Sequence, residues 1–546
     1  MTTRIYGIDL GTTYSCIARV DDDGRAEIID SADGPNTIPS VVYFQADGTY
    51  AVGETAVAES SRDAEHVVEL IKRHMGDPDH KEEQYGREYT PPEVSALILR
   101  KLAADAEMQT GERVTDVVIT CPAYFGQAGR EATRQAGEIA GFTVHYVIPE
   151  PTAAAIYYGA QQDVDQTVLV YDLGGGTFDV TVMRVEKGKV DVVATDGNAL
   201  LGGKDWDKRL AGHLADEFSR KTGVAADVFE SDLAAWRELS LLAERLKRGI
   251  SQKNSAKDTV RFGTDHALVE VTREKFDELT RDLLDSTVSL THAVIAEAAT
   301  LGADRIDKVL LVGGSTLMPQ VKARIESLGI APVEHTKPNL AVGLGAALLG
   351  HSCMMQKLLE GELWKRGLKT GDAVPKEVLE RVRCELGLGP GQSLNIVEVG
   401  LVSSKNFGIK VLEDVDGVDT PMCCNLVVRN ERIPASVSRT FGTVVDRQRT
   451  VALTLWENDA DVPKFGTVPL DQCVLLQEGA DLDFGKPVAR GTPVHIDFHL
   501  SKDGRLTATG RAEGGQTLTI EVEIAGSLSK QAVEEARAHQ NAMRQA

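Results

Sequence analysis

Two stretches of the 546-residue chain, YGIDLGTTYSCIARV (6–20) and VYDLGGGTFDVTVMRV (170–185), share one pattern. In each, an apolar run ends in Asp-Leu-Gly, a short stretch of Gly and Thr follows, and a second apolar run begins. The match sets Asp9 against Asp172. Because glycine permits tight turns between strands, each stretch predicts a β-hairpin. Two copies so far apart predict a duplicated domain whose two hairpins face each other.

The chemistry of the two predicted turns indicates their ligand. Gly and Thr leave backbone N–H groups free to contact phosphate oxygens, because no bulky side chain covers them. The Asp before each turn would repel a phosphate unless a divalent cation lay between them, and carboxylates bind Mg²⁺ directly or through its waters. Two such turns therefore predict a nucleoside triphosphate with Mg²⁺, held between two lobes. The chain has no GxxxxGK[ST] motif, which excludes a P-loop enzyme, and no GxGxxG motif after a strand, which disfavours a dinucleotide site.

Residues 1–350 alternate β-rich apolar runs with amphipathic helical stretches. VTDVVITCP (114–122) predicts a strand, EATRQAGEIAG (131–141) a helix and TVLVYDL (167–173) a second buried strand. Alternation of this kind is typical of α/β domains. We therefore expect a single α/β unit that ends near residue 350.

The rest of the chain has a different texture. In TPVHIDFHL (492–500) and TLTIEVEI (517–524), apolar and polar residues alternate with a period of two, as in a half-buried antiparallel sheet. We therefore expect a β-sandwich domain over residues 394–526. Residues 351–393 have helical character broken by Gly and Pro and predict a helical connector. Residues 527–546 include a helix-capping serine and predict a short C-terminal helix.

Charge and cysteine content limit the partners. Asp and Glu outnumber Lys and Arg by 82 to 59, a formal net charge of −23, which repels nucleic acid and anionic membranes. We therefore expect neither as a partner. The seven scattered cysteines contain no CxxC pair, and the chain has neither an 18-residue apolar run nor a secretory signal at its start, so we expect a cytoplasmic protein with free thiols. His495, Asp497 and His499 alternate along one predicted strand, where a solvated strand face is a better interpretation than a metal site.

Further motifs occur in order along the chain: IKRHMG (71–76), CPAYFGQAGREAT (121–133), PEPTAAAIYYG (149–159), LLGGKDWD (200–207), AERLKRGIS (243–251) and LVGGST (311–316). With the two Asp-Leu-Gly stretches, they resemble the 70-kilodalton heat-shock (DnaK-type) chaperones of the actin and sugar-kinase ATPase superfamily. The resemblance covers nearly all of residues 3–350 and, more loosely, 394–545. It implies a duplicated actin-like (ribonuclease H-like) two-lobed ATPase domain, an antiparallel β-sandwich domain that binds peptides, and a short C-terminal helix that is a truncated lid.

The resemblance also implies roles for individual residues. Lys72 matches the lysine that reaches the γ-phosphate and the attacking water, and Glu150 matches an acid in the metal's water shell. Asp9 and Asp172 match the other metal-binding carboxylates, and Thr177 and Asp179 complete the catalytic set; which carboxylate orients the water is left open. The implied cofactors are ATP and Mg²⁺, with K⁺ as a further candidate. Glu244, Lys247, Arg248 and Ser251 share one helix face, which spacing alone would assign to solvent. The implied nucleotide contacts are Gly11, Thr12, Thr13, Tyr14, Gly174, Gly175, Gly176, Gly202, Gly203, Glu244, Lys247, Arg248, Ser251, Gly313, Gly314 and Ser315.

The family's peptide groove and interdomain relay also have matching positions. The groove is implied at Ile409, Leu412, Phe441, Val444, Val451 and Leu453. Pro122 and Arg130 match the relay that reports nucleotide state to the peptide-binding domain. The implied partners are unfolded or extended polypeptide segments, a J-domain co-chaperone and a nucleotide exchange factor.

Four departures from the family pattern bear on function. Leu317 stands where an adenine-stacking Arg is usual, and Asn339 replaces an acid, so we expect a weaker grip on the nucleotide. Asn395 interrupts the apolar linker at 394–399, which predicts altered coupling between the domains. The lid is expected to be absent beyond its first helix, which predicts fast exchange of bound peptide.

These observations are compatible with three functions. The first is an ATP-hydrolysing chaperone that binds unfolded segments under nucleotide control. The second is an ATP-dependent adaptor or regulatory module dedicated to one protein partner, with weak general chaperone activity. The third, a sugar kinase of the same superfamily, would leave the β-sandwich domain without a purpose.

Overall fold

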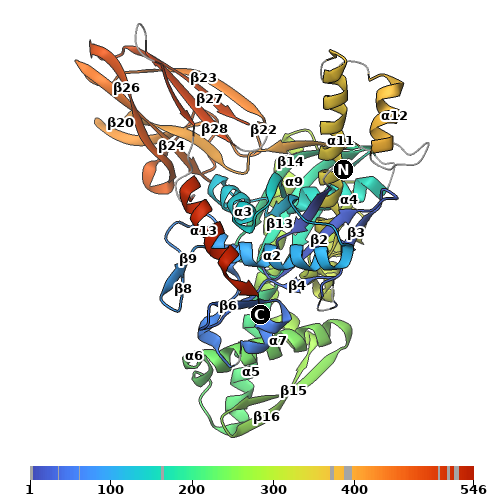
Figure 1. The fold of residues 1–546 in the computed structure, drawn as a ribbon. Coiled ribbons are helices and arrows are strands. Elements are labelled where there is room, and N and C mark those ends of the chain that lie inside the picture. The colour runs from blue at the N-terminus through green and yellow to red at the C-terminus, as the bar shows by residue number, and fades with distance from the viewer. Residues whose placement is uncertain are drawn as a thin grey trace.

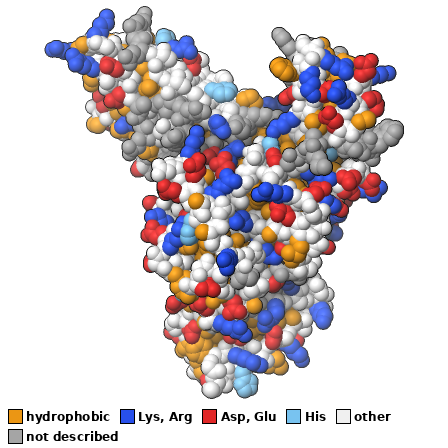
Figure 2. Space-filling view, viewed as in Figure 1, with side chains coloured by type: hydrophobic (Ala, Val, Ile, Leu, Met, Phe, Trp, Pro, Cys, Tyr) orange, Lys and Arg blue, Asp and Glu red, His pale blue; other side chains and the backbone are white. Residues whose placement is uncertain are grey.

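The computed structural model describes residues 4–32, 34, 36–60, 62–161, 165–368, 374–385, 396–501, 505–512, 517–521 and 528–545. Figure 1 shows a two-lobed α/β body with two projections at one end, a β-rich domain and a helical hairpin. On the face in Figure 2, acidic and basic side chains are interspersed across this body. Within the described residues, no helix combines the length and apolar character that crossing a membrane requires.

Two mixed sheets with the same topology form the α/β body, as duplication predicts. In each, an antiparallel hairpin is extended by a third strand on one side and by two parallel strands on the other. The first sheet contains β1 (Ile5–Asp9), β2 (Tyr14–Val20), β3 (Ala26–Ile29), β4 (Ile38–Pro39), β10 (Asp116–Cys121) and β11 (Thr143–Pro149). The second contains β12 (Gln166–Leu173), β13 (Phe178–Glu186), β14 (Lys189–Asn198), β17 (Lys308–Val312) and β18 (Val333–His335). The predicted duplicated two-lobed fold is therefore confirmed.

Two helices, α4 (Glu150–Gln161) and α11 (Ala341–Lys365), pack between the sheets and share one apolar core with both. The helices cross at very short range, because a Cβ at Gly345 would overlap the carbonyl oxygen of Ala153. Glycine at this crossing removes the steric block that any side chain would impose. This close packing holds the first residue of α4, Glu150, in a fixed place relative to both hairpins.

Outer segments extend each lobe around these sheets. The first lobe adds α1 (Glu54–Glu59), α2 (Pro91–Thr110), α3 (Gln127–Ala140), η1 (Ala64–His66), η2 (Ile71–His74), β5 (Val42–Phe44), β6 (Thr49–Val52), β7 (Val67–Val68), β8 (Glu82–Gln84) and β9 (Arg87–Tyr89). The second adds α5 (Gly203–Thr222), α6 (Val228–Ser231), α7 (Leu233–Gln252), α8 (Arg273–Leu279), α9 (Arg281–Thr300), α10 (Pro319–Ser327), η3 (Gly314–Leu317), β15 (Ser255–Phe262) and β16 (Asp265–Thr272). The cleft between the lobes lies where the two sets approach each other.

The C-terminal half forms the predicted β-sandwich. One sheet contains β20 (Asn406–Val415), β21 (Val418–Val427), β24 (Gln448–Asn458), β25 (Thr467–Pro469) and β26 (Val474–Val488), with η4 (Leu470–Gln472) beside it. The other contains β23 (Ala435–Gly442), β27 (Pro493–Leu500), β28 (Leu506–Ala512) and β29 (Thr517–Glu521). The alternation predicted for residues 492–500 is observed, since the even-numbered residues of β27 from Val494 to Leu500 are buried. The last three residues of the stretch 517–524 lie outside the described residues.

The β-sandwich is docked on the α/β body. Strand β19 (Glu398–Val402) pairs in parallel with β14, the edge strand of the second sheet, and β22 (Arg432–Ile433) extends the sheet further. The segment that joins the two domains therefore completes a sheet of the α/β body. Asn395 of the predicted linker interruption lies outside the described residues.

Helix α13 (Lys530–Ala542) returns to the first lobe and runs alongside α2 and α3 (Figure 1). The hydroxyl of Ser529 accepts a hydrogen bond from the N–H of Ala532 at 3.2 Å, so the predicted helix cap is confirmed. The buried Gln540 side chain donates to the carbonyl of Glu93 at 2.7 Å. Strand β30 (Arg544–Gln545) then pairs with β6. The C-terminal helix is thus held on the first lobe rather than on the β-sandwich.

The connector region differs from the expectation in one respect. Helix α11 continues without a break from Ala341 to Lys365, so the expected boundary at residue 350 falls inside a helix. After the turn at Gly367, α12 (Lys376–Glu385) packs back on α11 through Val378 and Val382. These two helices form the second projection in Figure 1. Gly371 and residues 386–393 lie outside the described residues.

Candidate functional site

The two Asp-Leu-Gly turns meet at the base of the cleft. A Cβ at Gly175 would overlap the side chain of Thr13, and a Cβ at Gly176 would overlap that of Thr12. The two turns can approach this closely only because the second turn has glycine at these positions. The residues that face the glycines, Thr13 and Thr12, carry hydroxyl groups. The prediction that the hairpins face each other is confirmed, and both turns line one cavity of about 550 Å³.

The two matched aspartates lie at the ends of corresponding strands, where Asp172 is buried and Asp9 is half-buried. Asp9 ends β1, where its Oδ1 accepts a hydrogen bond from the Thr120 hydroxyl at 2.9 Å. Burial and the nearby carboxylate of Glu150 raise the pKa of Asp9 to about 7. Burial also raises the pKa of Asp172 well above its ordinary value, with further contributions from Glu150, Asp179 and Asp9. Both aspartates therefore stand in a site that holds more negative charge than its surroundings neutralise.

Lys72 and Glu150 complete this charged centre. Lys72 lies on η2, is 3% exposed, and donates to the carbonyl of Leu10 while pairing with Glu150. Burial lowers the pKa of Lys72, but Glu150 and Asp9 raise it by more, so its pKa lies above the ordinary value. Glu150 is the first residue of α4, where the positive end of the helix dipole favours a carboxylate. One lysine thus faces several carboxylates.

Asp179 is the fourth carboxylate of the group and is itself buried. It lies opposite Asp172 across the second hairpin and accepts hydrogen bonds from the N–H groups of Ala123, at 3.0 Å, and Tyr124, at 3.3 Å. Burial, and then Glu150, raise the pKa of Asp179 well above its ordinary value. A divalent cation would relieve this excess of buried negative charge, and oxygen donors are those that Mg²⁺ prefers. The donor set therefore fits Mg²⁺, with Asp9, Glu150 and Asp172 as the residues that would hold it.

One side of the cavity is lined by α7 and carries an ion-pair network that joins the lobes. Arg248 donates to the Tyr14 hydroxyl at 2.7 Å and to Glu244 at 2.6 Å, while Glu244 also pairs with Lys204 at 3.1 Å. Burial raises the pKa of Glu244, but Lys204, Lys247 and Arg248 lower it to about 2. The face of α7 that spacing alone would leave to solvent therefore lines the cavity.

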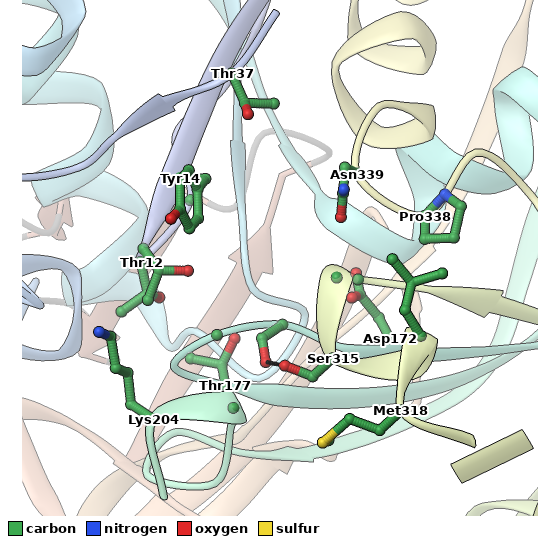
Figure 3. A pocket seen from close by; sticks show the side chains of 18 of the residues that line it. Thr12, Tyr14, Thr37, Asp172, Thr177, Lys204, Ser315, Met318, Pro338 and Asn339 are labelled. Atoms are coloured by element: carbon green, nitrogen blue, oxygen red, sulfur yellow. Dashed lines mark hydrogen bonds between the residues drawn. The ribbon is translucent and has the colours of Figure 1, made fainter. Parts of the chain in front are cut away.

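The remaining glycines hold the second turn in place. The N–H of Gly203 donates to the Gly174 carbonyl at 3.0 Å, and the Ser315 hydroxyl donates to the same carbonyl at 2.8 Å. A Cβ at Gly202 would overlap the backbone of Gly176. Figure 3 looks into the cavity, with Thr12 and Tyr14 on one side and Thr177 and Ser315 on the other. Gly11, Ser251, Gly313 and Gly314 also line it.

The two departures near the nucleotide positions both lie at this cavity. Leu317 lines it and is 51% exposed, so an apolar side chain stands where the family has a cation. Asn339 also lines it, and a Cβ at Gly314 would lie 2.7 Å from the Asn339 amide oxygen. Both departures therefore line the same cavity as the two phosphate-type turns.

Four charged residues of the site were not identified from the sequence: Arg73, Lys204, Asp205 and Asp207. Arg73 donates to the Gly176 carbonyl at 2.7 Å and pairs with Asp205 at 2.9 Å. Lys247 pairs with Asp207 at 2.8 Å. The signals were available, because Arg73 directly follows Lys72 and the other three directly follow Gly203 in LLGGKDWD. Their roles depend on partners more than 35 residues away along the chain, which spacing does not predict.

The positions matched to the peptide groove lie on three strands and one loop of the β-sandwich. Ile409 and Leu453 are buried in its core, whereas Phe441 and Val451 are partly buried against that core. Leu412 is exposed and Val444 half-buried. The group is therefore divided between core packing and surface.

The positions matched to the relay lie where the two domains touch. The Phe125 carbonyl, one turn after Pro122, accepts hydrogen bonds from Arg130 at 3.2 Å and from the Ser404 hydroxyl at 2.9 Å. Ser404 precedes β20 of the β-sandwich. On the same surface, Glu457 of β24 accepts from the N–H of Gln127 at the start of α3, at 3.4 Å. The segment that contains both relay positions therefore contacts the β-sandwich through the main-chain groups of Phe125 and Gln127.

The chain was compared with models of known protein families. The family model described as "Hsp70 protein" matches residues 5–363, which is more than half of the chain and includes both turns and Lys72. Members of this family are chaperones that bind and hydrolyse ATP with Mg²⁺ and act on unfolded proteins together with co-chaperones. With its duplicated sheets, facing turns and this match, the chain belongs to the Hsp70 family.

Proposed function

We propose that the protein is an ATP-hydrolysing molecular chaperone that binds exposed hydrophobic segments of unfolded proteins under nucleotide control. The observation that carries this proposal is the meeting of two phosphate-type turns around a lysine and four carboxylates, three of them buried. The reaction converts ATP and water to ADP and phosphate, with Mg²⁺ neutralising phosphate charge when it is bound.

In this proposal the chain's own residues act mainly by positioning. Thr12, Thr13 and the N–H groups of Gly174 to Gly176 would hold the phosphates. Lys72 would reach the γ-phosphate and the attacking water, because its ammonium group lies at the first turn beside Glu150. Thr177, which lines the cavity, and Asp179, which lies opposite Asp172 across the second hairpin, would complete the catalytic set. Charge neutralisation and alignment are the main contributions that phosphoryl transfer requires of a protein.

A feature of the β-sandwich supports binding of an extended peptide. The pairing between β20 and β24 covers only Asn406–Ile409, and beyond it Leu412 on β20 and Val451 on β24 belong to separate strand pairs. Diverging strands of this kind offer main-chain groups to an extended segment, and adjacent apolar side chains offer a pocket. Burial of one leucine side chain contributes about 1.5–3 kcal/mol, and together with the main-chain hydrogen bonds of the extended segment we expect affinities in the micromolar range.

Nucleotide control is supported by a continuous set of contacts from the site to the β-sandwich. Asp179 accepts from Ala123 and Tyr124, and the next residue, Phe125, accepts from Ser404. A cation or phosphate that changed the charge at Asp179 would therefore act on a segment that touches the β-sandwich. A J-domain protein and a nucleotide exchange factor are the co-chaperones we propose by family analogy. The seven cysteines, none of them in a disulfide, are consistent with the cytoplasm as the proposed compartment.

A second candidate, an ATP-dependent adaptor dedicated to one partner, is favoured by the hairpin of α11 and α12. It projects from the body, and Trp364 near its tip is 81% exposed. Large exposed aromatic residues are enriched where proteins bind one another.

Single-turnover hydrolysis of radiolabelled ATP by the full chain tests the proposal. We expect Mg²⁺-dependent phosphate release without any acceptor, accelerated by several unrelated unstructured peptides that contain a leucine. Stimulation by one native protein and by none of the peptides would support the adaptor. Absence of phosphate release in every condition would overturn ATP hydrolysis itself, and a requirement for an added sugar would indicate a kinase.

A further inference from the structure

A cluster of metal-binding side chains lies on the turn that follows Lys72, outside the nucleotide cavity. It contains His74, Asp77 and His80, each of which offers one ligand atom within 4.8 Å of the others. His74 ends η2, and His80 precedes β8 by one residue. Within the described residues, no other group of histidines, cysteines and carboxylates meets this criterion, and His495, Asp497 and His499 are instead engaged by hydroxyls of β23.

The backbone of this turn is fixed by local and tertiary contacts. The N–H of Asp77 donates to the His74 carbonyl at 3.0 Å, and Asp77 Oδ1 accepts from the N–H of Asp79 at 3.0 Å. Gly76 has φ of +89° and packs on α3, where any side chain would overlap the backbone at Gly129. The backbone that carries the three candidate ligands is therefore fixed by hydrogen bonds within the turn and by packing on α3. This reduces the entropy cost of ordering the ligands around an ion.

The hydrogen bonding of His80 matches that of a metal ligand. Its Nε2 interacts with Glu82 Oε1 at 2.9 Å. Histidines that bind metals usually direct the second ring nitrogen to a carboxylate, which fixes the tautomer and orients the ring. Glu82 thus occupies Nε2 and leaves Nδ1 as the nitrogen assigned to an ion.

The two imidazoles lie almost parallel, with ring centroids 3.6 Å apart and an interplanar angle of 10°. The lone pair of an imidazole nitrogen lies in the plane of its ring, and two nearly parallel planes do not meet at one ion, so both nitrogens can reach one ion only if the rings tilt relative to each other. The His80 side chain is 24% exposed, which leaves room for this rotation. Bonds from Zn²⁺ to histidine nitrogen are about 2.0–2.1 Å long, so the three ligand atoms must move closer together to bind one ion. Rotation of the side chains can supply this movement without a change of the backbone.

We propose that His74, Asp77 and His80 form a binding site for a transition-metal dication such as Zn²⁺, separate from the Mg²⁺ of the nucleotide. Two imidazole nitrogens and one carboxylate oxygen suit Zn²⁺ and its first-row neighbours, whereas Mg²⁺ prefers oxygen donors only. Three protein ligands leave at least one position for solvent. The site lies two residues from Lys72 but uses none of the residues assigned to ATP, so the inference does not rest on the proposed function.

Equilibrium dialysis of the untagged full chain against Zn²⁺, with excess Mg²⁺ present, tests the site, followed by absorption spectra with Co²⁺ as probe. We expect one tightly bound ion per chain and a Co²⁺ spectrum without the thiolate charge-transfer band that cysteine ligands produce. Asp77→Asn and Asp79→Asn form a matched pair, because both remove one negative charge from the same turn and only Asp77 belongs to the cluster. We expect Asp79→Asn to bind Zn²⁺ with the affinity of the wild type and Asp77→Asn to bind it at least about tenfold more weakly.

His80→Ala and His74→Asn each remove one ligand and should also lower the affinity for Zn²⁺ at least about tenfold. Glu82→Gln should lower it about tenfold, because the His80 ring is then less well oriented. His66→Ala, a histidine stacked on Tyr85 nearby, should bind as the wild type does. An unchanged melting temperature without added metal reports that each variant is folded, and the two histidine variants test the site independently of each other. Equal affinities in Asp77→Asn and Asp79→Asn, a thiolate band with Co²⁺, or binding unaffected by loss of either histidine would overturn the proposal.

Discussion

Arg73 and Asp205, which belong to different lobes, form an ion pair 2.9 Å long across the cleft. Arg73 lies on η2 beside Lys72, and Asp205 lies near the start of α5 beside the glycines that hold the second turn. The same guanidinium also donates to the Gly176 carbonyl within that turn. Closure of the cleft and approach of Lys72 to the second turn are therefore linked through one side chain.

We expect Arg73→Ala to weaken ATP binding about tenfold, because a partly buried charge-assisted pair between the lobes is lost. Arg73→Lys should recover part of the affinity, since lysine keeps the charge but not the forked contact with Gly176 and Asp205. Calorimetric titration with ATP measures the affinity of both variants. In a double-mutant cycle with Asp205→Asn, the two losses should not add. Strict additivity would show that the pair does not contribute as a unit.

We expect Lys72→Ala to lower the single-turnover rate of ATP hydrolysis by about 100-fold or more while ATP still binds. The reason is that the substitution removes the cation at the centre of the carboxylates and leaves the turns intact. Lys101→Ala is the matched control, because Lys101 is also a buried lysine in an ion pair, with Asp105 at 2.7 Å, away from the cavity. The control should lower the melting temperature but not the rate. A wild-type rate in Lys72→Ala would contradict the assignment.

The raised carboxylate pKa values predict that the nucleotide-free protein sacrifices stability at its site. Between the ordinary aspartate pKa and the folded value, about 7 for Asp9, the folded state binds more protons than the unfolded state, so the free energy of unfolding falls as pH rises. Asp172→Asn removes one such charge. We expect it to stabilise the free protein on the order of 1–3 kcal/mol at about pH 8, with the advantage shrinking toward about pH 5.

Denaturant unfolding at several pH values, with and without Mg²⁺-ATP, measures this effect. Saturating Mg²⁺-ATP should stabilise the wild type more than Asp172→Asn, since the ion removes the repulsion that the mutation also removes. A variant less stable than wild type at all pH values without nucleotide would contradict the charge-crowding explanation.

Much of the fold could be predicted because its signals are local. The hairpins around Asp9 and Asp172, the cap at Ser529 and the alternation along β27 each depend on residues close together in sequence. The course of α11 was not predicted, because glycines in a helical stretch weaken the helical signal when taken alone. In the structure, Gly345 serves the close crossing with Ala153 instead.

The ion pairs of the site could not be predicted from local sequence patterns either. The Arg73–Asp205 pair joins residues 132 positions apart, and nothing in the spacing of either motif indicates the other. The pairing of β19 with β14 likewise depends on how the whole chain folds back. Local patterns identified the turns, but only the tertiary arrangement identified the charged residues between the lobes.

We expect Leu317→Arg to tighten ATP binding, because a guanidinium at this position can stack on an aromatic base and Leu317 lines the cavity. Such stacking contributes about 0.5–2 kcal/mol, or roughly 2- to 30-fold in affinity. Leu268→Arg, at an exposed leucine on β16 outside the cavity, controls for the added charge on this acidic protein. Equal changes in the two variants would indicate long-range attraction rather than stacking.

We expect Glu457→Ala to abolish most of the peptide stimulation of ATP turnover while the basal rate stays close to wild type. Glu457 is the β24 carboxylate that accepts from the start of α3, so its loss removes a contact between the domains but none within the cavity. Glu413→Ala, an exposed carboxylate on β20 of the same domain, is the control and should retain stimulation. Full stimulation in Glu457→Ala would show that this contact does not transmit the signal.

The central claim is that both turns act on a single Mg²⁺-bound nucleotide. Calorimetric titration of ATP into wild type, Asp9→Asn and Asp172→Asn, each with Mg²⁺ and with a chelator, tests it most directly. The account predicts one ATP per wild-type chain, a strong dependence on Mg²⁺, and comparable loss of that dependence in each variant, because the two carboxylates would share one ion. Uptake of ATP that is indifferent to Mg²⁺ in the wild type, or a loss confined to one of the two variants, would contradict it.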